Sequence, residues 1–192
     1  LGSLAYSLAM TEVARGCAST SVTMAVTNMV CDAICAFGND AQKNRYVPKL
    51  ATAEMPAGSF ALSEPGSGSD AASLKTTAVK RGDRYILNGS KSWTTSGDRS
   101  GVLLVMAKTD PEKGSRGISS IMIEPHMKGF SVGKHEEKMG LRASSTVTIT
   151  LEDVEVPEEN RLGDEGIGFK VAMRALDGGR IGVGSQALGI AQ

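Results

Sequence analysis

The sequence has few cysteines, few aromatic residues and no excess of charge of either sign. Lysine plus arginine and aspartate plus glutamate number 21 each among 192 residues, so the formal net charge is zero. A balanced charge does not favour a nucleic-acid or membrane-surface partner. No unbroken apolar run is long enough to cross a bilayer, and the first residues lack the pattern of a secretory signal. We therefore expect a soluble protein that is not secreted in this form and binds neither nucleic acid nor a membrane.

The three cysteines, Cys17, Cys31 and Cys35, fit neither a disulfide framework nor a metal site. Their number is odd, and they all lie in the first 35 residues. Cys31 and Cys35 would share one face of a helix, but both histidines, His126 and His135, lie in a distant segment rich in strand patterns. We expect small buried thiols in a reducing compartment, and no bound metal.

Apolar residues recur at helical spacing from residue 1 to about residue 53. Gly16 and Gly38 interrupt this pattern and predict the ends of helices. A further short helix is predicted to begin with Asn39 or Asp40 as its cap, because both side chains accept hydrogen bonds from the free amides of a first turn.

Between the two helical ends, the apolar spacing changes to the alternation typical of strands. The predicted strands are Gly58–Ser63, Leu74–Lys80, Tyr85–Lys91, Val102–Lys108, Ile118–Glu124, Phe130–Lys134 and Ser145–Val156. Many short strands at regular spacing predict an antiparallel barrel or sandwich. A final helix is predicted from Phe169 to Gln192, although its internal glycines weaken the pattern.

These segments predict an α+β multidomain chain. Residues 1–55 are expected to end an N-terminal helical domain, residues 56–158 to form a central β domain, and residues 159–192 to begin a second helical domain. The helical patterns run to both ends of the chain without a capping signal. We expect the chain to be the middle of a longer protein, or to need partner chains that cover these apolar faces.

The most informative segment is FALSEPGSGSD, Phe60 to Asp70, where an apolar run breaks into a glycine-rich turn. Pro65 restricts its own φ, while Gly66 and Gly68 permit positive φ and let a ligand approach the backbone. Consecutive amides in such a turn can bind an anion. A segment of this composition is nevertheless more often a plain surface turn, so the loop alone is a weak signal.

The same loop also fits a loose form of the dinucleotide fingerprint, at residues 66–71. A Rossmann glycine loop must open a helix. Here the apolar residues that follow alternate around the turn at residues 81–83, which is typical of a β-hairpin. The Rossmann interpretation therefore ranks well below that of a cradle for a polar ligand.

Six motifs follow one another along the chain: RGCAST at 15–20, ALSEPGSGSDA at 61–71, NGSKSWTT at 88–95, KMGLRASST at 138–146, EDVEVP at 152–157 and GFKVAMRALDGGRIG at 168–182. In this order they resemble the acyl-CoA dehydrogenase family, most closely its short-chain (butyryl-CoA) branch. The resemblance covers essentially the whole chain. It implies FAD-dependent oxidation of a short-chain acyl-CoA to the trans-2-enoyl-CoA, with electrons passed to an electron-transfer flavoprotein. It also implies a homotetramer in fatty acid β-oxidation, cytoplasmic in a bacterium or in the mitochondrial matrix of a eukaryote.

The resemblance further implies which residues bind the cofactor and the substrate. In the family, the residue at the position of Ser63 bonds the pyrimidine side of the flavin. The residue at the position of Ser69 reaches the pyrophosphate and CoA. Trp93 packs against the flavin and Thr95 bonds its N5 atom, whereas most relatives carry isoleucine at the position of Thr94. The implied cofactor residues are Phe60, Ala61, Leu62, Ser63, Glu64, Pro65, Gly66, Ser67, Gly68, Ser69, Trp93, Thr94 and Thr95. The implied substrate residues are Ser69, Asp177, Gly178, Gly179 and Arg180.

The implied reaction needs a carboxylate that removes the α-proton while the β-hydrogen leaves as hydride. In most of the family this glutamate belongs to a Glu-Gly-Thr-like motif that the chain lacks, and in the isovaleryl and long-chain branches it occupies the position of Gly179. Glu64 is the nearest substitute, but the family has a glutamate there besides its base. We assign no catalytic residue to this chain and expect it to have negligible dehydrogenase activity by itself.

Simpler interpretations stay open beside the resemblance. A lone tryptophan is more often a core residue, and an Asp and an Arg three positions apart, as at Asp177 and Arg180, usually form a solvated helix pair. A catalytically incomplete FAD- or CoA-binding paralogue or subunit, an acyl-CoA oxidase, and a β module without a cofactor are the alternative functions.

Overall fold

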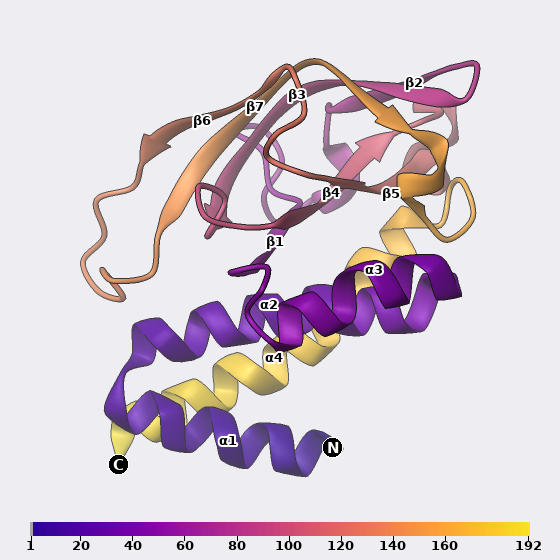
Figure 1. Cartoon of the computed structure of the whole chain (residues 1–192). Helices are drawn as coiled ribbons and strands as arrows, with labels where there is room; N and C mark the ends of the chain where they lie inside the picture. The colour runs from indigo at the N-terminus through magenta and orange to yellow at the C-terminus, as the bar shows by residue number, and fades with distance from the viewer. Residues whose placement is uncertain (1) are drawn as a thin grey trace.

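The computed structural model describes residues 2–192, which form four α-helices on one side of a curved sheet (Figure 1). The helices are α1 (Ser3–Gly16), α2 (Ala18–Phe37), α3 (Asp40–Ala51) and α4 (Gly168–Ala191). The breaks predicted at Gly16 and Gly38 are confirmed. Asn39 caps α3, because its side chain accepts from the Gln42 amide at 2.8 Å while the Gln42 side chain accepts from the Asn39 amide at 3.1 Å.

The predicted order of helices, β domain and helix is confirmed, and most strand pairs are antiparallel as expected, but the sheet does not close into a barrel. The strands are β1 (Gly58–Ala61), β2 (Thr77–Arg81), β3 (Arg84–Thr95), β4 (Val102–Lys108), β5 (Ile118–Ile123), β6 (Phe130–His135), β7 (Thr146–Pro157) and β8 (Arg161–Leu162). Among residues 2–192 they form one open sheet in the order β6-β7-β3-β2-β4-β5-β8, with β1 also paired to β4. Both β1 and β2 pair with β4 in parallel. Apolar alternation locates strands but does not say which strands pair, so these parallel pairs could not be predicted.

Two clusters of buried apolar side chains hold the layers together. The first lies between the sheet and the helices and includes Leu104 and Met106 of β4 with Val30 of α2. The second lies within the curve of the sheet and includes Leu103 and Val105 of β4 with inward residues of β3, β5 and β7. Strand β4 is therefore buried on both faces, which explains its unbroken apolar run.

Three of the glycines that weakened the helical pattern of α4, Gly179, Gly182 and Gly189, lie in close contact with neighbouring helices. A Cβ added at Gly189 would overlap the carbonyl oxygen of Thr11 in α1, and one added at Gly182 would overlap the hydroxyl group of Tyr6. Gly184, in the same helix, has open space around it. Helix α4 thus has lower intrinsic helix propensity at the positions that allow close contact with α1.

The expectation that all three thiols are buried is wrong. Cys17 and Cys35 are exposed, whereas Cys31 is half-buried and packs against the first cluster; all three are free. Helix α2 is long and apolar enough to cross a membrane by length and composition. Interspersed polar residues such as Asn28 and Asp32 hid this in the sequence, because they leave no unbroken apolar run. In the structure α2 packs against α4 and β1.

Candidate functional site

The loop that follows β1 is shaped by a tight turn. The Glu64 amide donates to the Ser67 carbonyl oxygen at 2.9 Å, and the Ser67 amide donates back to Glu64 at 3.1 Å. Pro65 and Gly66 form the exposed tip of this turn. The Ser67 hydroxyl donates to the Asp70 carbonyl at 2.8 Å, so this predicted cofactor residue uses its side chain within the loop. The hairpin predicted after the loop is confirmed as β2 and β3.

Glu64 points into the protein and accepts hydrogen bonds from four donors. They are the Lys75 amide at 2.6 Å, the Thr76 amide at 3.0 Å, the Thr76 hydroxyl at 2.5 Å and the Lys91 ammonium at 2.7 Å. Burial raises the pKa of Glu64, but the hydrogen bonds from Lys91 and Thr76 outweigh burial and hold this pKa below its ordinary value. A carboxylate that is ionised and fully engaged in this way is poorly suited to remove a substrate proton.

Lys91 is the buried cation that faces Glu64. It lies on β3 with none of its surface exposed, and its ammonium also donates to the Leu62 carbonyl at 3.2 Å. Burial lowers the pKa of Lys91 to about 8, while the hydrogen bond to Glu64 opposes this effect. The Ser92 amide next to it donates to the Ser63 carbonyl at 2.8 Å. Three successive loop residues are thereby joined to β3.

The buried pair predicts a pH-dependent stability. We expect Glu64→Gln to lower the free energy of unfolding by about 3 kcal/mol near neutral pH, because it leaves Lys91 without a counter-charge. The folded-state pKa of Glu64 lies below its ordinary value of 4.5, so its stabilisation is present above that value and is lost as the pH falls below it. Urea unfolding should therefore show a smaller difference between wild type and variant at about pH 4 than near neutral pH.

The matched control is Glu158→Gln. Besides a contact with Arg161 at 3.3 Å, this change breaks the ion pair between Glu158 and Lys80 at 2.6 Å. Both side chains of that pair are over a third exposed, so solvent screens their attraction and the change in stability should be small at both pH values. A Glu64→Gln difference that did not vary with pH would contradict the role of the ionised carboxylate.

Trp93 is held in an exposed position by an irregularity in β3. The pairing with β7 shifts register between Lys91 and Thr94, and Trp93 has a φ of 55°. A residue other than glycine in this region costs on the order of 1–3 kcal/mol. The Trp93 side chain is nevertheless 62% exposed. Strain at a large exposed aromatic residue indicates a binding surface, and the interpretation of Trp93 as a core residue is wrong.

The predicted cofactor residues around Trp93 differ in how buried they are and in which of their groups could contact a ligand. Ser63 and Thr95 are half-buried and Ser69 is exposed, so part of each residue is accessible to a ligand. The Thr95 carbonyl accepts from the buried Ser59 hydroxyl at 2.7 Å, which fixes this end of β3. Thr94 points inward, and its buried hydroxyl has no partner within residues 2–192. Thr94 can therefore meet a ligand only through its backbone.

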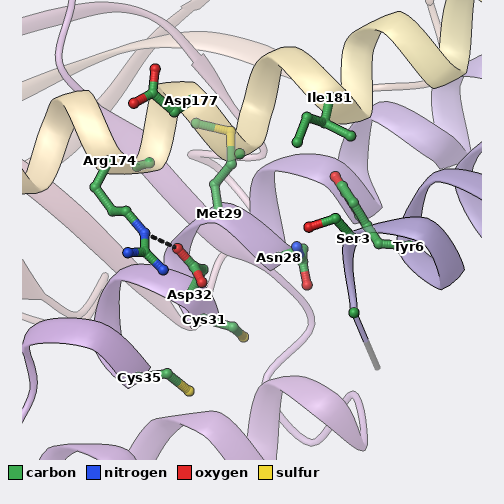
Figure 2. A pocket seen from close by; sticks show the side chains of 13 residues that line it. Ser3, Tyr6, Asn28, Met29, Cys31, Asp32, Cys35, Arg174, Asp177 and Ile181 are labelled. Carbon is green, nitrogen blue, oxygen red and sulfur yellow. Dashed lines mark hydrogen bonds and ion pairs between the residues drawn. The ribbon is translucent and has the colours of Figure 1, made fainter.

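The predicted substrate residues on α4 lie beside α1 and α2. Asp177 and Arg180 form an ion pair in which both side chains are 69% exposed, as expected for a solvated helix pair. Asp177 and Gly178 line a cavity of about 470 Å³ between the three helices (Figure 2). Gly179 is buried, and an added Cβ would lie 2.8 Å from Sδ of Met29. Within residues 2–192, no hydrogen bond or ion pair joins this segment to the loop.

The cavity shown in Figure 2 combines polar and apolar side chains. In this view Tyr6 and Ile181 line one end of the cavity. Toward the other end, the Arg174 guanidinium contacts the Asp32 carboxylate at 3.2 Å. The structure thus separates the predicted residues into two groups, one around the loop and Trp93 and one beside this cavity.

Sequence reasoning missed Lys91 and Thr76, which hold Glu64 in place. Lys91 lies on the same inward side of β3 as the buried Tyr85 and Leu87. A lysine at an inward position of a strand requires a buried partner, and this signal could have identified Lys91. The partner could not have been identified, since Glu64 is 27 residues away in the sequence.

Comparison with known proteins relates both halves of the chain to one family. The family model of the acyl-CoA dehydrogenase middle domain matches residues 59–154, and that of the N-terminal domain matches residues 1–54. The mitochondrial short-chain specific acyl-CoA dehydrogenase of Rattus norvegicus is 47% identical over 190 residues, covering 98% of this chain and 46% of that protein. Acryloyl-CoA reductase (NADH) of Anaerotignum propionicum is 45% identical over 193 residues, covering 100% of this chain and 49% of that protein. The chain thus spans about half the length of these curated relatives.

Solved structures share the fold. Butyryl-CoA dehydrogenase from Megasphaera elsdenii superposes with a TM-score of 0.96 at 44% identity, over 99% of this chain and 50% of that chain. Glutaryl-CoA dehydrogenase from Mycobacterium smegmatis in complex with FADH2 has a TM-score of 0.90 at 31% identity, over 98% and 47%. A chain in the structure of the electron transferring flavoprotein of Acidaminococcus fermentans has a TM-score of 0.97 at 46% identity, over 100% and 50%.

The two family models and the solved structures agree on one class of fold, a helical N-terminal domain followed by a β-sheet middle domain. The chain belongs to the acyl-CoA dehydrogenase family. The resemblance carried by the six sequence motifs is therefore confirmed.

Proposed function

We propose that this protein oxidises a short-chain acyl-CoA to the trans-2-enoyl-CoA with FAD as its cofactor. The observation that carries the proposal is the junction between the glycine-rich loop and β3, where the Ser92 amide donates to the Ser63 carbonyl and the next residue, Trp93, is exposed. Identity of 47% to a relative named for short-chain specificity supports the substrate class. An electron-transfer flavoprotein as electron acceptor, and a homotetramer as the assembly, complete the proposal.

The residues at this junction fit a flavin cofactor. The hydroxyl groups of Ser63 and Thr95 can bond the polar edge of the ring without burying an unpaired charge. Trp93 offers a large flat surface that can cover a ring face. Gly66 and Gly68 have open space where a Cβ would lie, so a ligand can approach the backbone closely there. FAD bound here would supply the acceptor for the hydride that leaves the β-carbon.

The residues of this chain would bind and orient the cofactor and the substrate, and would shield the cofactor from water. Trp93 would exclude water from the cofactor, and Ser69 would hold the pyrophosphate or CoA by its hydroxyl group. The carboxylate oxygens of Glu64 already accept hydrogen bonds from four donors, and Gly179 has no side chain that could accept a proton. We therefore assign the general base to none of the described residues.

Anaerobic addition of butyryl-CoA to the full-length protein, purified with FAD, tests the proposal. We expect the flavin absorbance to bleach as the substrate is oxidised, and residues 1–192 alone to give negligible bleaching. Flavin absorbance that butyryl-CoA leaves unchanged would overturn the short-chain dehydrogenase assignment. Reduction of an electron-transfer flavoprotein without release of peroxide would exclude an oxidase, and absence of flavin from the purified protein would favour the β module without a cofactor.

The second candidate is reduction of a 2-enoyl-CoA, which the 45% identity to acryloyl-CoA reductase (NADH) favours. This reaction is the reverse of the proposed one at the same carbon atoms, so the described site serves either direction. Oxidation of NADH that depends on added acryloyl-CoA, faster than oxidation of butyryl-CoA, would establish the reductase instead.

A further inference from the structure

We propose that Lys91 and Glu64 act as a pair of positioning residues that holds the loop at a defined distance from Trp93 and so sets the width of the flavin site. The inference rests on the proposed function and deepens it, because it adds a residue outside the predicted set and changes the role of another. Neither side chain would touch the cofactor.

The pair closes the loop at both of its ends. At the start of the loop, Lys91 donates to the Leu62 carbonyl and to the Glu64 carboxylate. At the end of the loop, the same carboxylate accepts from the amides of Lys75 and Thr76, the residues that lead into β2. One carboxylate thus joins the start of the loop, its end and strand β3.

The inward position of Lys91 also determines the direction in which the Trp93 side chain points. Lys91 points inward and Thr94 points inward, yet they are three residues apart, so the alternation of β3 is broken between them. Trp93 takes up this break with its positive φ and points outward. Because the buried ammonium fixes the inward direction at Lys91, it fixes the start of the irregularity that presents the indole ring.

A buried ion pair is a poor source of stability compared with apolar side chains of similar volume. The ion pair instead fixes a position, because each of its hydrogen bonds joins a specific atom of the loop or of β3. Apolar substitutes would fill the same space without selecting one position of the loop. A role in positioning accounts for a lysine with no exposed surface in the middle of a sheet.

Lys91→Met in the full-length protein tests the pair, with Tyr46→Phe as matched control. The Tyr46 hydroxyl donates to the Glu124 carboxylate at 2.9 Å, so the control also removes a buried hydrogen bond to a carboxylate, but between α3 and the end of β5. We measure the dissociation constant of FAD by titration of the apoprotein, and hydrogen exchange of the loop amides in that apoprotein. Lys91→Met should raise the dissociation constant at least about tenfold and speed loop exchange, while Tyr46→Phe should change either by less than about twofold.

A dissociation constant and loop exchange that stay within twofold of wild type in Lys91→Met would overturn the proposal, as would equal effects in the control. Should Lys91→Met fail to fold, Glu64→Gln, which keeps the shape of the side chain, replaces it and is judged by the same two measurements. Wild-type protein that binds no FAD would contradict the proposed function, whereas loop exchange would still test the pair.

Discussion

Replacing Gly189 by alanine is expected to lower the free energy of unfolding by about 3 kcal/mol, at the upper end of the cost of overpacking. The added Cβ would overlap the carbonyl oxygen of Thr11 and lie 2.8 Å from the Cβ of Ala14, so α1 and α4 would have to move apart. Neither obstacle is the flexible end of a side chain. Urea unfolding of wild type and variant measures the difference directly.

Gly184→Ala is the matched control in the same helix. An added Cβ at Gly184 meets nothing within 4 Å, so the higher helix propensity of alanine should stabilise the protein by about 1 kcal/mol. The two substitutions are chemically identical, and only the contact with α1 separates them. Stabilisation of similar size by both would show that α1 and α4 do not pack as the structure describes.

Replacing Trp93 by glycine is expected to weaken FAD binding about tenfold or more without lowering the stability of the apoprotein. Loss of the indole removes a large flat contact, and about 1.4 kcal/mol corresponds to a factor of ten in affinity. Because glycine adopts positive φ freely, the substitution also removes the backbone strain at φ 55°. FAD titration and urea unfolding of the apoprotein separate these two effects.

Trp93→Phe is the control that keeps an aromatic ring. It should lose less FAD affinity than Trp93→Gly, and it should leave the backbone strain in place because phenylalanine also disfavours positive φ. A Trp93→Gly apoprotein that is strongly destabilised, with FAD affinity unchanged, would show that the indole supports the fold rather than the cofactor.

Local patterns predicted the secondary structure well because the forces that set it act over a few residues. The capping box from Asn39 to Gln42 spans only four residues, and the apolar run at Val102–Lys108 marked a strand with the same bounds as β4. Burial on both faces requires such a run, whichever strands lie beside it. The pairing of β4 with β1 and β2 in parallel joins distant segments, and no local pattern encodes it.

The sequence predicted the separate segments of the candidate site, but not how these segments are arranged in space. The loop at Phe60–Asp70 and the segment around Trp93 each carried a motif, and their resemblance to one family named the cofactor. The exposure of Trp93, the inward direction of Thr94 and the junction of Ser63 with Ser92 depend on the register shift in β3. The positions of Asp177 and Gly178 beside a cavity likewise depend on how α4 packs against α1 and α2.

The sequence by itself determined the family, the helices and strands, and the chemistry available to the loop, because residue types and local spacing suffice for each. Only the tertiary structure decided that Glu64 is engaged with a buried Lys91 and that Gly182 and Gly189 of α4 allow close contact with α1. Both features arise between residues far apart in the chain. Burial and hydrogen bonding there depend on the packed arrangement of several elements, which local propensity does not contain.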